Sequence, residues 1–233
     1  MIAEASKLAK ATGTVKATAK PVRQRLIDAG ERLFAEHGLN GVGIRTIAEA
    51  ADVSLAALNY HFGEKENLLA EIFAERARPI AAERMRLLAE IEASGTITLE
   101  RVIEAFLRPA FGAGSEARFK LFAKLRARLA TESEAFKGRI RATAFDESSR
   151  RYIAALQALL PELSPQELGW RFHFLLGAML YTMADAGRIQ SLTDGKCDPG
   201  DVQAVMSHIV PFMAAGFRSA PPPGSVRRKP RKK

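Results

Sequence analysis

Hydrophobic and polar side chains alternate with a helical period over almost the whole chain. Between Arg23 and His37, apolar or small residues return every three or four positions, which places them on one face of a helix. No stretch of useful length alternates like a strand, so we predict an all-α fold. The same reading predicts further helices at about 45–51, 55–62, 64–92, 99–112, 116–131, 135–159, 165–186 and 201–216.

Breaks between these helices indicate how the chain is divided. Gly63 stands where one helix must end, and Ser54 is a good N-cap for the helix before that glycine. We expect the three helices within 22–68 to form one small domain and those within 69–217 to form a helical bundle behind it. Residues 187–198 are polar and are predicted to be a loop.

Residues 44–62 have the pattern of a helix-turn-helix. Two short helices are separated by a three-residue turn, and small residues such as Ala48 and Ala51 would let the helices cross closely. Val53 would fill the turn. In such a motif the second helix lies in the major groove of DNA and the first crosses the backbone. The pattern therefore predicts a DNA-binding domain near the N-terminus.

Residues 23–69 resemble the DNA-binding domain of the TetR family over its whole length. They read RQRLIDAGERLFAEHGLNGVGIRTIAEAADVSLAALNYHFGEKENLL, and the part from Val53 to Leu69 is the most distinctive. The resemblance implies an N-terminal three-helix helix-turn-helix domain joined to a helical ligand-binding and dimerisation domain. It also implies a regulator that acts as a homodimer on a double-stranded DNA operator, most often as a repressor.

The resemblance assigns roles to individual residues of the motif. Contacts to DNA phosphates are implied for Arg45, Thr46, Tyr60, His61 and Lys65. Base contacts are expected from the exposed side of the second helix, since Asn pairs with adenine and Ala or Leu can touch a thymine methyl. The residues expected there are Ser54, Leu55, Ala56, Ala57 and Asn59. Taken singly, each phosphate contact has an alternative, because Tyr60 could pack, His61 could be a surface imidazole and Lys65 could snorkel.

The helix over 165–186 is apolar on two sides, whereas a surface helix needs one apolar stripe. The last helix is apolar to a similar extent. In the TetR family the last two long helices of each subunit form a four-helix dimer interface, and this pair resembles that arrangement. The residues expected at the interface are Trp170, Phe174, Gly177, Ala178, Tyr181, Val205, Ile209, Phe212 and Met213.

The C-terminal sequence also resembles a TetR subgroup that includes regulators responsive to fatty acids or their coenzyme A esters. This implies a small hydrophobic or amphipathic effector, with a fatty acid or an acyl-coenzyme A-like molecule as candidates. Aromatic residues at helical spacing can equally be plain core, and a buried histidine can simply bond a carbonyl. The residues expected to contact the effector are Phe106, Phe122, Arg126, Phe145, Tyr152, His173 and Phe174.

Charge is concentrated at the two ends of the chain. The net charge is +9, but residues 1–21 carry four Lys and one Glu, and residues 218–233 carry seven Lys or Arg and no acid. Both segments are expected to be disordered basic tails. Such tails either attract nucleic acid by counterion release or serve solubility alone. Residues 22–68 have five basic and seven acidic side chains. Binding to phosphates there must therefore depend on where the basic side chains lie and not on the net charge.

Other classes of function find little support. The single cysteine, Cys197, cannot form an internal disulfide and fits a reducing, cytoplasmic setting. We expect no metal or other cofactor and no membrane span. An enzyme is disfavoured because no nucleophile elbow, phosphate loop or paired carboxylates can be found. The alternative to a regulator is a structural protein that binds DNA through its basic tails.

Overall fold

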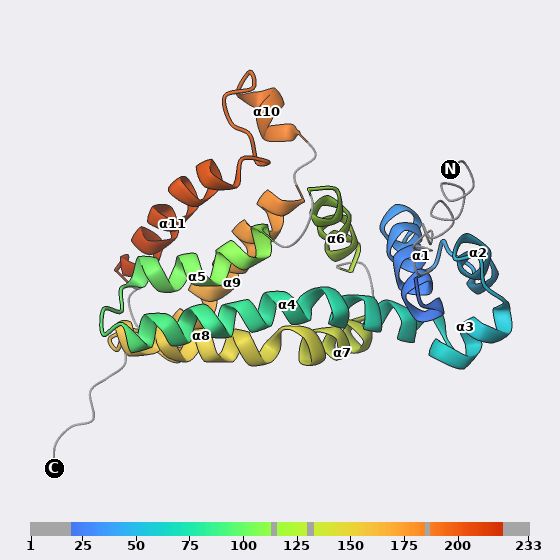
Figure 1. The fold of residues 1–233 in the computed structure, drawn as a ribbon. Coiled ribbons are helices and arrows are strands. Elements are labelled where there is room, and N and C mark those ends of the chain that lie inside the picture. The colour runs from blue at the N-terminus through green and yellow to red at the C-terminus, as the bar shows by residue number, and fades with distance from the viewer. Residues whose placement is uncertain (1–19, 113–115, 130–132, 185–186, 221–233) are drawn as a thin grey trace, which may run out of the picture.

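The structure, a computed structural model, describes residues 20–112, 116–129, 133–184 and 187–220. All regular structure in these ranges is helical, which confirms the all-α prediction (Figure 1). The predicted basic tails at 1–21 and 218–233 lie almost wholly outside the described residues. The helices are α1 (Val22–His37), α2 (Ile44–Ala50), α3 (Leu55–Phe62), α4 (Lys65–Ala93), α5 (Leu99–Phe111), α6 (Glu116–Leu129), α7 (Glu134–Ala144), α8 (Asp146–Leu159), α9 (Pro165–Met183), α10 (Arg188–Leu192) and α11 (Val202–Arg218).

Helices α1, α2 and α3 form a small head at one end of the molecule (Figure 1). Leu26, Phe34, Ile47 and Leu58 come from all three helices and are fully buried between them. Ser54 caps α3 as expected, since its hydroxyl oxygen accepts a hydrogen bond from the backbone N–H of the third residue on, at 3.1 Å. The head is thus held by its own core and by local caps.

Helix α4 joins the head to the rest of the molecule. Its 29 residues correspond to about 44 Å at the α-helical rise of about 1.5 Å per residue. Arg76 of α4 donates from Nε to both oxygens of Glu31 at 3.0 Å, and from Nη2 to Asp28 at 3.2 Å. The hydrogen bond with Glu31 raises the pKa of Arg76. This partly buried ion-pair network seats α1 on α4.

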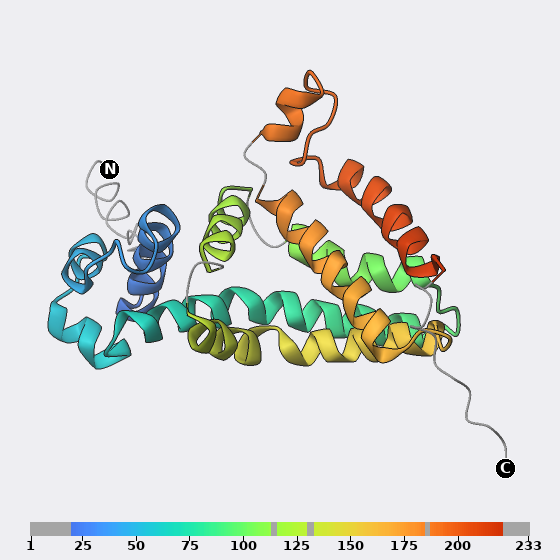
Figure 2. The same ribbon diagram turned by 180° about the vertical axis from the view of Figure 1, so that it is seen from behind.

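The remaining helices build a body on the far part of α4 (Figures 1 and 2). Helices α5, α7 and α8 pack against α4, α9 packs against α8, and α11 lies on α5. Helix α6 stands between the two parts, since it packs against α1 of the head and against α9 of the body. It is therefore the second connection between head and body, beside α4.

Two predicted elements differ from the structure. The helix predicted over 135–159 is divided into α7 and α8 at Phe145, whose ψ of −26° and φ of −134° depart from helical values. Asp146 and Glu147 then stand in the first turn of α8, where negative charge is favourable. The loop predicted over 187–198 contains the short helix α10.

Candidate DNA-binding interface and ligand-binding body

Helix α3 has one face in the head and one face in solvent. Leu58 and Phe62 are buried against the head, whereas Asn59, Tyr60 and His61 are exposed, Tyr60 to 86%. Ser54 and Ala56 are exposed as well, and Leu55 and Ala57 are half-buried. The residues expected to read bases therefore lie on or beside the open face, as a recognition helix requires.

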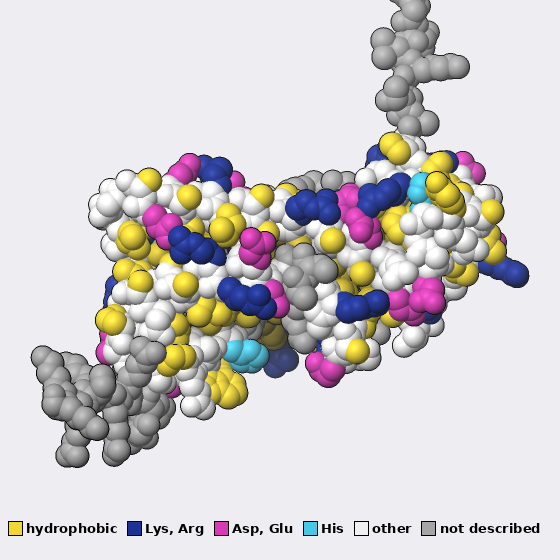
Figure 3. Space-filling view, turned by 90° about the horizontal axis from the view of Figure 1, so that it is seen from below, with side chains coloured by type: hydrophobic (Ala, Val, Ile, Leu, Met, Phe, Trp, Pro, Cys, Tyr) yellow, Lys and Arg dark blue, Asp and Glu magenta, His cyan; other side chains and the backbone are white. Residues whose placement is uncertain are grey.

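The start of α2 is equally accessible. Arg45 and Thr46 are both exposed, and neither forms an ion pair with a residue of the described ranges. Figure 3 shows a face of the molecule on which basic and acidic side chains are interspersed rather than gathered by sign. The phosphate contacts of Arg45 and Thr46 stay a prediction that rests on their exposed positions.

Lys65 has a role that sequence reasoning did not predict. Its Nζ donates to the carbonyl of Leu39 at 2.8 Å and to that of Val42 at 3.4 Å, and its side chain is half-buried. The ammonium therefore holds the connection between α1 and α2 against the start of α4. A phosphate contact from Lys65 would have to share this ammonium with the two carbonyls.

Arg25 is a further residue of the head that the sequence analysis missed. Its Nη1 donates to the carbonyl of Asp52 at 2.9 Å and to the Asp52 carboxylate at 3.2 Å. Asp52 has a φ of 53°, in the left-handed region that few non-glycine residues adopt. The arginine thus pins the turn between α2 and α3 from outside the motif and helps to set the angle of α3.

Five of the seven predicted effector residues lie in the body, where Phe106, Phe122 and Tyr152 are buried and Arg126 and Phe145 are half-buried. Phe106 and Tyr152 are buried with ring centroids 5.1 Å apart. The Arg126 guanidinium lies 5.8 Å from the centroid of Phe122 and 4.8 Å from that of Phe145. These residues come from α5, α6, α8 and the junction of α7 with α8, so the fold brings together distant parts of the chain.

The other two predicted effector residues do not belong to this interior cluster. The side chains of His173 and Phe174 are exposed, Phe174 to 60%. They lie beside Trp170, whose ring stacks on Phe174 with centroids 6.0 Å apart. The neighbouring Phe172 points inward instead and meets Phe106 at 5.0 Å. His173 and Phe174 are therefore corrected from interior positions to the outer face of α9.

A buried arginine, Arg84, was absent from the predicted set. It is 2% exposed, its Nε donates to the carbonyl of Phe106 at 2.7 Å, and its guanidinium lies 3.7 Å from the Phe106 ring centroid. The Tyr152 hydroxyl donates to the Arg84 carbonyl at 2.7 Å. A signal was present in the sequence, because Arg84 stands in the buried stripe of α4 that includes Ile80 and Leu88.

The outer face of α9 and α11 exposes large aromatic side chains. Trp170 is 53% exposed and Phe212 is 73% exposed, while Tyr181 is exposed to a similar extent. At Gly177 an added Cβ would meet no atom within 4 Å, so close approach from outside is open there. Aromatic side chains exposed in such number on two adjoining helices are typical of a surface that another protein covers.

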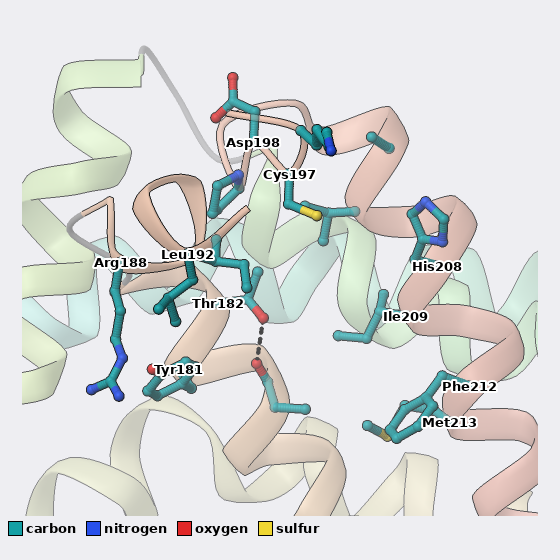
Figure 4. A pocket seen from close by; sticks show the side chains of 16 residues that line it. Tyr181, Thr182, Arg188, Leu192, Cys197, Asp198, His208, Ile209, Phe212 and Met213 are labelled. Atoms are coloured by element: carbon teal, nitrogen blue, oxygen red, sulfur yellow. Dashed lines mark hydrogen bonds between the residues drawn. The ribbon is translucent and has the colours of Figure 1, made fainter. Parts of the chain in front are cut away.

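A pocket of about 590 Å³ opens on the same side, between α9, α10 and α11 (Figure 4). The predicted effector residues do not line it. Polar groups at its edge include Arg188, Asp198 and His208. Its walls include most of the predicted interface residues, namely Ala178, Tyr181, Val205, Ile209, Phe212 and Met213. The pocket is thus continuous with the expected dimer surface.

Neither a metal-binding group nor a membrane span is found among the described residues. Among them, no group of three or more His, Cys, Asp or Glu side chains is arranged to hold a metal ion. None of the helices there combines the length and apolar character that a bilayer span requires. The candidate sites among the described residues are the open face of the head, the interior cluster and the outer face of α9 and α11.

Known families and structures match both parts of the molecule. A model of "Bacterial regulatory proteins, tetR family" matches residues 26–72, and one of "Tetracyclin repressor-like, C-terminal domain" matches residues 104–216. The HTH-type transcriptional repressor AcnR of Corynebacterium glutamicum is 40% identical over 79 residues, which cover 33% of this chain and 40% of AcnR. The chain thus spans less than half the length of that relative.

Two solved structures share the fold over nearly their whole length. The fatty acid degradation regulator FadR from Bacillus halodurans aligns with a TM-score of 0.61 at 18% identity, covering 87% of this chain and 99% of FadR. The TetR family regulator PfmR from Thermus thermophilus aligns with a TM-score of 0.60 at 18% identity and the same coverage. Identities this low support the fold alone.

The family models and the matched relatives are regulators, which confirms the prediction of a regulator over the enzyme alternative. The N-terminal model falls on the head and the start of α4, and the C-terminal model falls on the body. Both belong to one family and occur in the expected order. The chain therefore belongs to the TetR family of bacterial regulatory proteins.

Proposed function

We propose that the protein is a homodimeric repressor that binds a palindromic operator and is released from it by a small hydrophobic or amphipathic effector. The observation that carries the proposal is the open face of α3 on a head matched by a TetR model. The proposed DNA-binding domain spans 22–68, and the effector-binding and dimerisation domain spans 69–217. Acting on an operator, the protein would work in the bacterial cytoplasm.

The proposed DNA contacts divide into two kinds. Asn59 projects from the exposed side of α3 and would pair with a base, while Ser54, Leu55, Ala56 and Ala57 would pack along the groove. A second set would position the head on the DNA backbone without reading sequence. The residues of that second set are Arg45, Thr46, Tyr60, His61 and, shared with its two carbonyl partners, Lys65.

Two copies are needed because one short recognition helix contributes little affinity. Heads about 34–36 Å apart would read successive major grooves of the duplex. The outer face of α9 and α11 would bring the copies together, with Trp170, Phe174 and Phe212 buried between them. A second copy would also close the pocket in this face, which explains why that pocket is continuous with the exposed aromatic rings.

The effector would bind among the aromatic side chains in the interior of the body. Phe106, Phe122, Phe145 and Tyr152 provide an apolar environment beside a charged group, Arg126. A fatty acid or an acyl-coenzyme A-like molecule has both parts, and the similar fold of FadR, a fatty acid degradation regulator, is in keeping with this class. The interior cluster is therefore the proposed sensor.

Arg128 would carry the signal from the sensor to the head. It lies on α6, as Arg126 does, and donates to the carbonyls of Ala35 at 2.8 Å and Glu36 at 2.6 Å in the last turn of α1. A shift of α6 on effector binding would therefore pull directly on α1. A coupling of about 1–3 kcal/mol would change operator affinity roughly 5- to 150-fold.

The test is selection of bound sites from random DNA, followed by anisotropy titrations of the enriched site. We expect one palindrome to be enriched. Asn59→Ala should weaken operator binding roughly 5- to 150-fold, since a bidentate base contact is worth about 1–3 kcal/mol. The variant should also lose the preference for one base pair in each half-site. Gln203→Ala, which removes an exposed amide on α11, is the matched control. Enrichment of no sequence would contradict the proposal.

A structural DNA-binding protein is the second candidate, and the charge of the two ends of the chain favours it. It predicts binding that ignores sequence and disappears when residues 1–21 and 218–233 are removed. A repressor predicts that the trimmed protein loses affinity for all DNA about equally and keeps its preference for the palindrome. Competition titrations with the operator and a scrambled duplex distinguish the two.

A further inference from the structure

Arg84 is a buried charge in an apolar position. It occupies the stripe of α4 between Ile80 and Leu88, where the other side chains are apolar. Its guanidinium stacks on Phe106 and donates to the Phe106 carbonyl and, at 3.6 Å, to the sulfur of Met179. These partners are neutral, so they satisfy hydrogen bonds and leave the positive charge without an opposite one.

Arg126 is a second cation at the same group of aromatic rings, and its side chain is half-buried. It lies on α6 over the rings of Phe122 and Phe145, and it forms no hydrogen bond or ion pair with the described residues. The two arginines are close enough to repel each other, and this repulsion adds to burial in lowering the pKa of Arg84 to about 9. Burial lowers the pKa of Arg126 to about 10. Both stay charged at neutral pH.

A buried guanidinium with a second, half-buried guanidinium near it is costly. A buried charge is normally paired with an opposite one, and the carboxylates of the described residues pair elsewhere or lie in solvent. Phe106 and Phe122 replace part of the lost hydration by cation–π contacts, which are weaker than a carboxylate partner would be. The two arginines therefore lack an acidic partner among the described residues, and the carboxylate of a bound ligand would supply one.

We propose that Arg84 and Arg126 form an internal anion site that binds the carboxylate of a small organic acid with an apolar body. Guanidiniums bind carboxylates through paired, charge-assisted hydrogen bonds, and the aromatic rings around them suit an apolar chain or ring. The inference rests on the proposed effector site and narrows it, since it requires the free acid. An ester, amide or alcohol of the same body lacks the charge that the arginines need.

The site is also placed to act on the head. Arg126 lies two residues before Arg128 on α6, and Arg128 is bonded to the last turn of α1. A carboxylate that draws Arg126 toward Arg84 would move α6 relative to α4 and α1. Binding of a carboxylate would thereby shift α6 and, through Arg128, the head that carries α3.

The experiment measures ligand binding by the full chain without DNA, using isothermal titration calorimetry and thermal unfolding. The probes are octanoate, octanamide, 1-octanol and potassium chloride. Octanoate should bind at least 10-fold more tightly than octanamide or 1-octanol, and chloride should give no comparable stabilisation. Because no DNA is present, this result is independent of whether the protein proves to be a repressor.

The variants are Arg126→Met and the control Arg139→Met, which removes an exposed arginine stacked on Phe136 at 5.4 Å. Arg126→Met should weaken octanoate binding about 10- to 100-fold, as expected for loss of charge-assisted hydrogen bonds. It should also leave the ligand-free melting temperature unchanged or higher, because it removes a half-buried charge that has no acidic partner among the described residues. The control should bind octanoate as the wild type does.

Three outcomes would overturn the proposal. Equal binding of octanoate and 1-octanol would show an apolar site with no role for charge, and equal stabilisation by chloride would show a site for inorganic anions. A lower melting temperature for Arg126→Met with unchanged octanoate affinity would assign Arg126 to the fold. If Arg126→Met does not fold, Arg126→Lys is measured instead, and it should retain a preference for octanoate over octanamide.

Discussion

The exposed face of α3 and the exposed face of α9 and α11 both leave aromatic rings in solvent, but their surroundings differ. On α3 the open ring is Tyr60, with Asn59 and His61 beside it. On α9 and α11 the open rings include Trp170 and Phe212, with glycine and aliphatic residues between them. The first face offers the hydrogen-bonding groups of Asn59, Tyr60 and His61, and the second offers apolar area.

This difference indicates the partner of each face. A polar duplex is bound through hydrogen bonds and placed charges, and an exposed tyrosine or asparagine costs little when the DNA is absent. A face of tryptophan and phenylalanine gains free energy chiefly by removal from water, which a second protein surface provides. The following predictions test whether the two faces can be disabled separately.

The largest effect is expected from Phe174→Glu. In a two-fold dimer the substitution would bring two carboxylates into an apolar interface, so we expect the dimer to dissociate completely at micromolar concentration. Operator affinity should fall at least 100-fold, because each head would then bind alone. Sedimentation velocity and anisotropy titrations measure the two effects.

Ile97→Glu is the matched control for this experiment, because it places the same charge at an exposed apolar position outside the α9–α11 face. It should leave the dimer and operator binding unchanged. If Phe174→Glu is as dimeric as Ile97→Glu, then the outer face of α9 and α11 is not the dimer interface, and the comparison between the two faces loses its basis.

A smaller effect, confined to the head, is expected from Glu31→Gln. Glu31 is 2% exposed and forms the shortest ion pair of Arg76, so its neutralisation leaves that half-buried guanidinium with Asp28 and Glu75 alone, at a cost of about 1.5–3 kcal/mol. Urea titrations should show this loss and a fall in operator binding, while the dimer persists. Glu83→Gln, which breaks a solvent-exposed pair with Arg86, should have no comparable effect on the urea midpoint.

Tyr60→Ala should have a moderate effect on one face alone. Loss of a phosphate hydrogen bond in each head should cost about 1–3 kcal/mol for the two heads together. Operator and non-specific DNA should be affected alike, since a phosphate contact carries no sequence information. Tyr181→Ala is the converse variant, and it should weaken the dimer while leaving the heads intact. If Tyr60→Ala weakens the dimer in sedimentation, or if Tyr181→Ala disrupts the heads themselves, the two faces are not independent.

The smallest effect is expected from the pair that ties α11 to α5. Arg218 Nη2 donates to Glu100 at 3.0 Å, and this hydrogen bond lowers the pKa of Glu100. A lowered pKa in the folded state means that the pair stabilises the protein above the unfolded pKa of about 4.3 and loses this effect as pH falls below it. Glu100→Gln should therefore cost under about 1 kcal/mol at pH 7 and nothing near pH 3, by urea titration at each pH.

Much of the head could be predicted from the sequence. Ser54 caps α3 and Gly63 ends it, and both features depend on residues within one helical turn. The break at Phe145 was missed, although Asp146 and Glu147 after it are a favourable helix start, because the apolar period continues across the break. Local chemistry thus predicted where helices begin more reliably than where a long pattern is interrupted.

The sequence by itself determined the helical class, the helix-turn-helix and the apolar excess of the last long helices, because these follow from periodicity and caps within a few residues. The tertiary structure alone decided that Phe172 points inward while Phe174 points outward, and that Lys65 binds two carbonyls. It also brought Arg84 of α4 within electrostatic reach of Arg126 of α6. Such outcomes depend on which distant helices pack together, and no short-range pattern encodes that choice.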